Sequence, residues 1–454
     1  MAKFDFSNRD SFGSKIGVIA AAAGSAVGLG NIWRFPYVAG ENGGAAFLII
    51  YVIAIIAIGM PVMLSEFAIG RMAQRNAYGA FRKLAPRRPW YLIGVMGILG
   101  AFMILSFYST VAGWTLEYLS DSLTNSFSGK STQELTQSFQ TFQSSGWHPV
   151  MWQVIFMILT AGIVISGVER GIEKYAKVLM PILLVLIFAM VIRSLTLPGS
   201  SEGLAFLFAP DFAKINASVV LQALGQAFFS LSIGMGVLIT YGSYINKKDN
   251  LGNSAAAISL TDTLIAILAG VAIFPAVFAF NIDPKAGPEL VFITLPNIFN
   301  QMPAGYYFSI LFFSLLVIAA LTSSISVLEV VVAFLTEQLN WHRRKATLIA
   351  ATVITFTGII CTMSQGPWEN IRLFGLNVFE ILDWTSANLL LPLGGFFIVI
   401  FVGWFLSRDM VKNEITNNGT VRSVLFNAYI FIVRYVAPIV ILIIFLFGLG
   451  VFGN

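Results

Sequence analysis

Charged residues are scarce in this chain of 454 residues: Asp, Glu, Lys and Arg make up 11% of it, and hydrophobic residues make up 57%. Soluble domains carry about 25% charged residues. A single cysteine, Cys361, excludes an intramolecular disulfide, and two histidines, His148 and His342, are too few for a conventional His/Cys metal centre. The composition indicates an integral membrane protein and argues against redox or zinc chemistry.

Long apolar stretches recur along the whole chain. A helix that crosses the roughly 30 Å hydrocarbon layer needs about 20 residues. We predict an all-α integral membrane protein with eleven transmembrane helices, near residues 12–38, 42–70, 90–120, 150–168, 175–197, 218–244, 254–281, 304–337, 345–363, 374–406 and 424–451. The largest polar insert, Ser120 to His148, is predicted to be an outer loop. No linker separates soluble segments, so residues 1–454 are expected to form one membrane domain.

The orientation in the membrane follows from the basic residues, because cytoplasmic loops are enriched in Lys and Arg. With the N-terminus in the cytoplasm, the cytoplasmic segments hold most of these residues, among them Arg71, Arg87, Arg88, Arg343 and Arg344. An odd number of spans then leaves the C-terminus on the extracellular side. No short apolar core with a small-residue cleavage site follows Met1 to Lys15, so we expect no removed signal peptide.

Two predicted spans are interrupted by small residues at mid-membrane depth, the first at Gly24 to Asn31 and the sixth at Phe229 to Gly236. Hydrocarbon offers unpaired backbone groups no partner, so such breaks are tolerated only where they face protein or a water-filled cavity. Since each break opens a set of five spans, the second set enters the membrane from the opposite side. This predicts a 5+5 inverted repeat, about 12–197 and 218–406, with discontinuous helices 1 and 6, an extra helix at 424–451 and a binding site at the breaks.

The glycines of the breaks can also serve helix packing, because small residues let membrane helices approach closely. Polar side chains accompany both breaks, at Asn31 in the first and at Ser230 and Ser232 in the second. These favour a binding site over packing alone. A nucleotide-binding loop is excluded, because no Lys-Ser/Thr follows the glycines and no strand precedes them.

The sequence from Gly24 to Pro36 closely resembles the first-span signature of the neurotransmitter:sodium symporter family. Agreement continues through Glu41 to Gly44, Gln226 to Gly236 and Leu321 to Ser324, so the resemblance extends over nearly the whole chain. Eleven spans are typical of the bacterial branch of amino acid transporters. The resemblance implies a sodium-coupled symporter that imports neutral, hydrophobic or aromatic, amino acids by alternating access, and no enzyme activity.

The resemblance also implies two sodium sites made of carbonyl, hydroxyl, amide and carboxylate oxygens. The first site, Na1, would use Ala26, Asn31, Ser230 and Asp262. The second site, Na2, would use the carbonyls of Gly24, Val27 and Ala319 with the hydroxyls of Thr322 and Ser323. Hydroxyls adjacent on one helix also bond back to the preceding turn, which is the alternative for the last two residues.

Asp262 supports the first sodium site from the residues alone, because an acid within a span costs about 2.5 to 3.5 kcal/mol on insertion scales and is functional by default. Family members that require chloride have neutral residues here, so the resemblance implies that this carboxylate replaces the anion and that chloride is not required. Alignment from Gly270 and Pro275 shifts Asp262 by one residue, which leaves its direct contact with sodium open. The alternative is a solvated acid near the inner interface.

A substrate carboxylate fits the first break, because the half-helix that begins near Leu29 and Gly30 offers free N–H groups and the positive end of its dipole. The resemblance adds Tyr108, whose hydroxyl would bond that carboxylate, although core packing is its alternative. The other pocket positions are uncharged and suit an apolar or aromatic side chain: Ser25, Ala26, Ile104, Phe229, Ser230, Ser232, Met235, Ser326 and Val327. Met235 replaces the phenylalanine of some relatives, and its adaptable shape suits bulkier substrates.

Gates are implied on both sides of this pocket. Arg34 and Asp383 are costly at their depth, and they match the outer pair of the family. Charges at span ends are ordinarily only solvated, but the resemblance assigns the inner gate to Arg9, Phe12, Tyr244 and Glu337. Gly171 and Pro181 resemble the family motif at which helix 5 unwinds to admit water to the second sodium. A plain proline kink is the alternative.

The expected ligands are two Na⁺ ions and an amino acid, and the expected surroundings are the lipid of the cell membrane. We expect no nucleic acid and no obligate protein partner. An ion channel would instead need a continuous polar pore with several weak sites. A receptor would bind the amino acid without moving it, and an intramembrane enzyme would need a nucleophile and base pair, which the mid-span residues lack.

Overall fold

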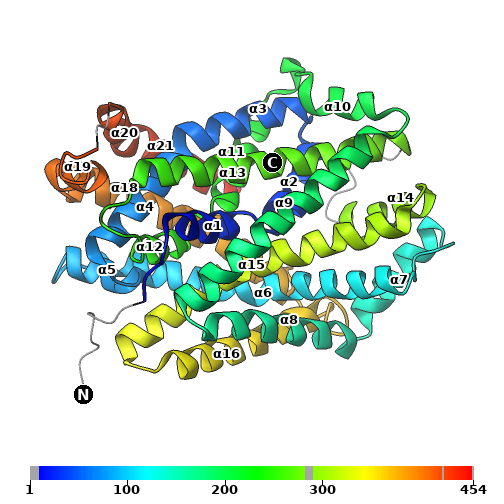
Figure 1. Cartoon of the computed structure of the whole chain (residues 1–454), viewed down its shortest axis with the longest axis horizontal. Helices are drawn as coiled ribbons and strands as arrows, with labels where there is room; N and C mark the ends of the chain where they lie inside the picture. Colours follow the sequence, from blue (N-terminus) through cyan, green and yellow to red (C-terminus); the bar gives the residue numbers. More distant parts are fainter. Residues whose placement is uncertain (1–9, 282–289, 422–423, 452–454) are drawn as a thin grey trace.

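The computed structural model describes residues 10–281, 290–421 and 424–451. In these ranges every regular element is a helix, and most of the long helices run along the length of the molecule (Figure 1). Nine of the described helices are long and apolar enough to cross a membrane: Ala45–Ala73, Tyr91–Leu123, Trp147–Ile165, Val168–Leu195, Leu251–Ala279, Gly305–Leu339, Arg343–Ser364, Val378–Phe405 and Phe426–Gly448. Each of them overlaps a predicted span.

Five of these helices are single α-helices, namely α6 (Tyr91–Leu123), α8 (Trp147–Ile165), α13 (Leu251–Ala279), α15 (Gly305–Leu339) and α16 (Arg343–Ser364). The others contain π-helical turns, which widen the helix by one residue. They are built from α3 (Ala45–Ala54) and α4 (Met60–Ala73), α9 (Lys174–Leu195), α17 (Val378–Trp384) and α18 (Leu391–Ile400), and α20 (Phe426–Phe431) and α21 (Ala437–Gly448).

Both predicted breaks are present. The first separates α1 (Lys15–Ala26) from the stretch Gly30–Glu41, which ends in α2 (Phe35–Glu41), and the two parts are bent by 48°. The second separates α11 (Ala217–Ser230) from α12 (Val237–Gly242). These two halves are shorter than a full span, so the count of eleven spans stays a prediction.

The polar insert Ser120 to His148 contains a helix that the sequence prediction missed, α7 (Thr132–Ser144). Ser131 and Glu134 form a capping box at its start, which satisfies two free N–H groups. Leu135, Phe139 and Phe142 recur at helical spacing and are buried against the bundle. The other short helices are α5 (Ala77–Leu84), α10 (Ser200–Phe208), α14 (Leu295–Gln301) and α19 (Arg408–Ile415).

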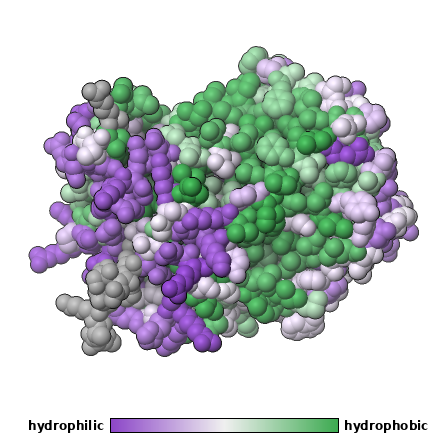
Figure 2. Space-filling model, in the orientation of Figure 1, coloured by the Kyte–Doolittle hydropathy of each residue, from purple (hydrophilic) through white to green (hydrophobic). Residues whose placement is uncertain are grey.

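The surface matches a protein immersed in lipid. Hydrophobic residues cover the middle of the molecule, and hydrophilic residues gather at the end where α5 and α19 lie (Figure 2). Large apolar side chains such as Ile56, Val185 and Phe356 are more than half exposed, at 63%, 68% and 66%. A soluble monomer rarely exposes a continuous apolar surface of this kind.

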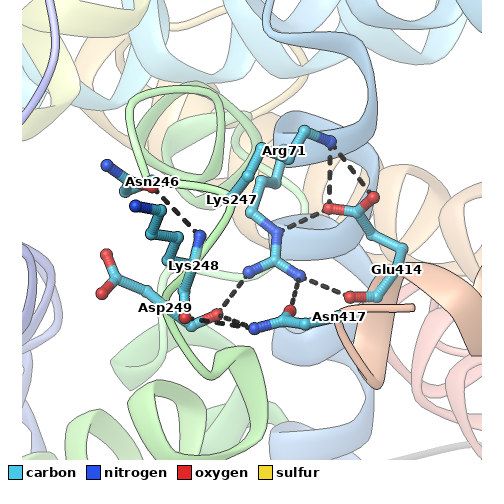
Figure 3. Close-up of polar contacts among 7 residues, drawn as sticks. All are labelled: Arg71, Asn246, Lys247, Lys248, Asp249, Glu414 and Asn417. Carbon is cyan, nitrogen blue, oxygen red and sulfur yellow. Dashed lines mark hydrogen bonds and ion pairs between the residues drawn. The ribbon is translucent and has the colours of Figure 1, made fainter. Parts of the chain in front are cut away.

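A buried arginine holds the hydrophilic end together (Figure 3). Arg71, at the end of α4 and 1% exposed, donates from Nε to Glu414 at 2.5 Å and from Nη2 to Asn417 Oδ1 at 2.8 Å. It also donates to the backbone carbonyls of Glu414 and Asp249, and Lys247 forms an ion pair with Glu414 at 3.1 Å. The cluster joins α4, the segment between α12 and α13, and α19.

Candidate functional site

The first break is a short non-helical segment between α1 and the π-helical turn Gly30–Arg34. Val27 ends α1 in an extended conformation, with φ −75° and ψ 98°. An added Cβ on Gly28 would lie 3.0 Å from Ser323, and one on Gly30 would lie 3.2 Å from the Phe229 ring. The glycines therefore let α15 and α11 approach the loosened backbone.

The second break is held open by residues with positive φ. Ser232, Gly234 and Gly236 have φ of 56°, 83° and 75°, a region that glycine adopts without steric cost. The Gly234 N–H donates to Oε1 of Glu66 at 2.8 Å, and the Glu66 side chain is fully buried. Glu66 was not among the residues predicted from the sequence, although an acid within a predicted span carries the same insertion cost as Asp262.

Three residues predicted for the first sodium site converge behind the first break. Asn31 Nδ2 donates to Oδ1 of Asp262 at 2.7 Å, and the Ser230 hydroxyl donates to Oδ2 of Asp262 at 2.8 Å. The Asn31 Oδ1 atom accepts from the Gly28 N–H at 3.2 Å. Asp262 is fully buried, so it is not a solvated acid near the interface. Ala26, the fourth predicted residue, ends α1 beside this group.

Tyr51 of α3 completes the cluster and was not among the residues predicted from the sequence. Its hydroxyl donates to Ser230 Oγ at 3.2 Å and to Oδ2 of Asp262 at 3.4 Å. The ring is fully buried and packs on Phe35, with 5.1 Å between centroids. Tyrosine is common in membrane helices, so no feature of the sequence near Tyr51 distinguishes it from packing residues.

The residues predicted for the second sodium site also lie together. The Thr322 hydroxyl on α15 donates to the Val27 carbonyl at 3.4 Å and to the Ala319 carbonyl at 3.1 Å. Gly24 faces the same side chain, because an added Cβ would lie 3.3 Å from Thr322 Cβ. The Ser323 hydroxyl also turns toward the end of α1. Carbonyl and hydroxyl oxygens from two chain segments thus meet beside the first break, and the bond of Thr322 to Ala319 is also the contact with the preceding turn that was the alternative for this residue.

A cavity of about 30 Å³ lies between the two breaks. Its lining comes from α1, the π-helical turn Gly30–Arg34, α6, α11, the second break and α15: Ser25, Ala26, Gly28, Gly30, Ile104, Leu105, Tyr108, Phe229, Ser230, Ser232, Met235, Ser323 and Val327. All predicted substrate positions except Leu29 and Ser326 are among these residues. Within the described ranges, no charged side chain lines the cavity.

Tyr108 and Leu29 meet at the edge of the cavity. The Tyr108 hydroxyl accepts a hydrogen bond from the Leu29 N–H at 3.3 Å, and the tyrosine is 8% exposed. This N–H lies at the start of the second half-helix. The structure therefore brings the tyrosine hydroxyl and the first backbone donor of this half-helix to one point.

Ser326 points away from the cavity. Its hydroxyl accepts from Tyr241 at 2.7 Å and donates to the Thr322 carbonyl at 3.2 Å. The resemblance gave the position of Ser326 along α15, whereas its orientation is set by Tyr241 on α12, which is distant in the sequence.

One side of the cavity is covered by Phe229, and Arg34 lies over Phe229. The Arg34 guanidinium lies over the Phe229 ring, 4.4 Å from its centroid, and bonds the side chain of Tyr37. Asp383 is close enough to interact electrostatically with Arg34. The ion pairs found within 4.0 Å among the described residues do not include the expected pair of Arg34 and Asp383.

On the opposite side, aromatic rings and a buried ion pair close the molecule. The Phe12 ring packs edge-on against Tyr241 and Tyr244, with centroid distances of 5.5 and 6.0 Å. The Tyr244 hydroxyl donates to Glu329 at 2.8 Å, and Arg343 forms an ion pair with the same carboxylate at 2.5 Å. Glu329 is fully buried and was not predicted, although it lies within the predicted span 304–337.

Another predicted gate residue, Glu337, contacts the start of α5. Glu337 accepts hydrogen bonds from the backbone N–H and the side-chain amide of Asn76, at 2.9 and 2.8 Å, where Asn76 caps α5. Arg9 lies outside the described residues. Gly171 lies in the π-helical turn Val168–Glu173, and Pro181 lies inside α9, which is helical throughout. The unwinding of helix 5 therefore stays a prediction.

Comparisons with known proteins agree with this geometry. A sequence model of the sodium:neurotransmitter symporter family matches residues 9–144 and 127–453. An uncharacterized sodium-dependent transporter of Bacillus subtilis is 41% identical over 96% of this chain and 97% of its own length. A similar transporter of Haemophilus influenzae is 39% identical over 97% of this chain and 98% of its own. The crystal structure of MhsT in complex with L-phenylalanine superposes with a TM-score of 0.90 and 46% identity, covering 97% of this chain and 100% of MhsT.

The helical multi-pass architecture, the two broken helices and the sequence match along nearly the whole chain all indicate the same family. The chain is a sodium-dependent membrane transporter and belongs to the sodium:neurotransmitter symporter family.

Proposed function

We propose that this transporter imports neutral amino acids with apolar or aromatic side chains, together with Na⁺. The observation that carries the proposal is the uncharged cavity between the two breaks, with Tyr108 and the Leu29 N–H at one edge. The polar edge suits the carboxylate of an amino acid, and Ile104, Phe229 and Val327 suit its side chain. MhsT, which is 46% identical, was crystallised with L-phenylalanine.

Two sodium ions are proposed to bind with the amino acid. One would lie at Asn31 and Ser230, beside Asp262, and the other between the end of α1 and Thr322 on α15. Asp262 supplies a fixed negative charge next to the first ion, so chloride is not required. The substrate carboxylate would approach the same ion, which couples the two ligands.

Transport is proposed to follow alternating access in a 5+5 inverted repeat with an extra eleventh helix. The N-terminus would be cytoplasmic and the C-terminus extracellular, because the end that holds α5 and α19 is rich in basic residues, as cytoplasmic segments are. Arg34 with Asp383 and Phe229 would close the outer path. Phe12 with Tyr244, and Arg9 with Glu337, would close the inner path. The cavity of about 30 Å³ is too small for an amino acid, so the helices around it must move to admit one.

The test is uptake by purified protein in liposomes. With an inward Na⁺ gradient, radiolabelled phenylalanine should accumulate, and a panel of twenty unlabelled amino acids should compete in the order of apolar side-chain size. Accumulation without a Na⁺ gradient, or binding without accumulation, would contradict the proposal. Accumulation without a Na⁺ gradient would contradict the proposed sodium coupling. Binding without accumulation would indicate a receptor.

A further inference from the structure

The start of α1 is held by one carboxylate from the long helix Val168–Leu195, which corresponds to the fifth predicted span. Glu173, at the end of the π-helical turn Val168–Glu173, accepts from the Gly13 N–H at 2.7 Å and from the Ser14 hydroxyl at 2.8 Å. Ser14 is the N-cap of α1 and itself accepts from the Gly17 N–H at 3.0 Å. Glu173 therefore extends the cap of α1 across to a different helix.

The fit around this carboxylate is close. An added Cβ on Gly17 would lie 2.1 Å from Glu173 Oε1, so only glycine leaves the carboxylate room to approach α1. Glu173 is 2% exposed. Lys177, one turn further along, forms an ion pair with it at 2.5 Å. Lys177 thus orients the carboxylate from within the same helix, and the start of α1 binds it from the neighbouring helix.

Electrostatic interactions favour the contact between the Glu173 carboxylate and the start of α1. The start of a helix carries free N–H groups and the positive end of the dipole, and both attract a negative charge. Charged hydrogen bonds are about twice as strong as neutral ones. Separation of α1 from Glu173 would leave the Gly13 N–H and the carboxylate to find new partners, so it carries a free-energy cost.

The position of α1 gives this contact a consequence for transport. α1 is 12 residues long and is attached to the rest of the first span only through the break that follows Ala26. It packs on α15, α13 and α9, and its far end carries the Val27 carbonyl that meets Thr322. A tilt at Ser14 would therefore be transmitted to the oxygens beside the break.

We propose that Glu173 is a latch: its carboxylate holds the start of α1 against the helix Val168–Leu195. Release of this contact opens the inner path to the second proposed sodium site. The latch rests on the proposed alternating-access function. Glu173 lies one residue before α9 begins. A change in the conformation of the π-helical turn would therefore move the carboxylate and α1 together. Glu173 is a positioning residue, since it contacts neither the cavity nor the proposed sodium ligands.

Accessibility of a reporter cysteine tests the latch. The single native cysteine, buried Cys361, is replaced by serine, and Ala21 of α1, which is 2% exposed, is replaced by cysteine. Labelling by a maleimide in Na⁺ buffer should be about tenfold faster in Glu173→Ala, which corresponds to a loss of about 1.4 kcal/mol of closure. The Na⁺ concentration that slows labelling by half should rise by about the same factor.

A second variant separates the latch from the stability of α1. Gly17→Ala makes α1 a better helix, because alanine has the higher helix propensity, yet its Cβ displaces the Glu173 carboxylate. It should accelerate labelling as Glu173→Ala does. Glu169→Gln is the matched control, since its exposed carboxylate also lies close to Gly13, where an added Cβ would be 2.8 Å from Oε1. The Gly13 N–H and the Ser14 hydroxyl bond Glu173 instead, so this variant should leave labelling unchanged.

The outcomes separate the latch from the proposed function. Unchanged labelling in both Glu173→Ala and Gly17→Ala would overturn the latch even if the wild-type protein accumulates amino acid. Equal acceleration in Glu169→Gln would overturn it too, because any loss of negative charge would then suffice. Faster labelling only in the two latch variants supports the latch, and it does so even if the wild-type protein fails to accumulate phenylalanine.

Discussion

Three fully buried carboxylates, Glu66, Asp262 and Glu329, lie on helices that cross the apolar middle of the molecule, and each is satisfied differently. Glu329 faces the guanidinium of Arg343, and Glu66 caps the backbone N–H of Gly234. Asp262 instead receives amide and hydroxyl donors, which are neutral. An unpaired buried charge is costly, so a cation bound beside Asp262 would gain more than one beside Glu329, whose charge is already paired.

We expect Asp262→Ser to reduce Na⁺-driven uptake about tenfold in chloride-free medium, the effect of about 1.4 kcal/mol. The serine leaves the proposed first ion without a neighbouring negative charge, and a chloride ion can then supply that charge. Added chloride should restore part of the uptake. The measurement is initial uptake into liposomes in gluconate and in chloride buffer.

Thr263→Ser is the control for this variant, since the Thr263 hydroxyl bonds back to the Ser259 carbonyl on the same helix. It should retain chloride-independent uptake. Equal uptake by Asp262→Ser in both buffers, at the wild-type level, would remove the proposed charge role.

Single residues were predictable from the sequence where their chemistry conflicts with lipid. Asp262 was identified by its insertion cost alone, and the same rule applied consistently would have found Glu66 and Glu329. Tyr51 and the orientation of Ser326 were not predictable, because each depends on a partner on a distant helix. Position along a helix can be read from the sequence, whereas side-chain partners depend on tertiary packing.

At the scale of elements, glycine and charged residues were the main basis for predicting where helices break. Both breaks were expected from small residues at membrane depth, because a backbone loosened there must face protein or water rather than lipid. Helix α7 was missed because its polar composition masked the spacing of its three buried apolar residues. The inner gate expected at Arg9 and Glu337 stays a prediction, because Arg9 lies outside the described residues, while Tyr244, expected in the same gate, bonds Glu329 two turns earlier on α15.

The cluster around Arg71 gives a prediction for the elements that it joins. Arg71→Ala should lower the free energy of unfolding by about 3 kcal/mol, the lower end of the usual cost of removing one partner from a buried ion pair. The lower end applies because Lys247 still faces Glu414 at 3.1 Å. Thermal unfolding of detergent-solubilised protein, followed by intrinsic fluorescence, measures the change.

Arg82→Ala is the comparison for the Arg71 variant. Arg82 is exposed on α5, and its guanidinium donates to the hydroxyl of its own helix neighbour Tyr78 at 3.0 Å. Its removal should cost less than about 1 kcal/mol, as is typical of surface charges. A similar loss of stability in both variants would mean that the buried cluster contributes nothing beyond an ordinary surface contact.

For the whole molecule, hydropathy predicted where nearly every long helix lies, because the thickness of the bilayer fixes the length of a span. Hydropathy does not encode which helices pack together. Contacts such as Tyr51 with Asp262 or Glu173 with Ser14 join residues 211 and 159 positions apart. The resemblance of the sequence to a family supplied several long-range relations, such as that of Asn31 with Asp262, and the residues alone supplied the breaks.

Coupling between sodium and substrate is a property of the whole molecule and gives the last prediction. Saturating phenylalanine should raise the affinity for Na⁺ by the same factor by which saturating Na⁺ raises the affinity for phenylalanine, within the usual range of about 5- to 150-fold. Asn31 would link the two proposed sites, since its Oδ1 faces Gly28 at the break and its Nδ2 faces Asp262. Asn31→Ala should therefore reduce both factors toward one. Thr110→Val removes a buried hydrogen bond to Thr362 away from the cavity and should keep the coupling. Isothermal titrations of each ligand with and without the other measure both factors, and a coupling that survives in Asn31→Ala would show that the two sites communicate by another route.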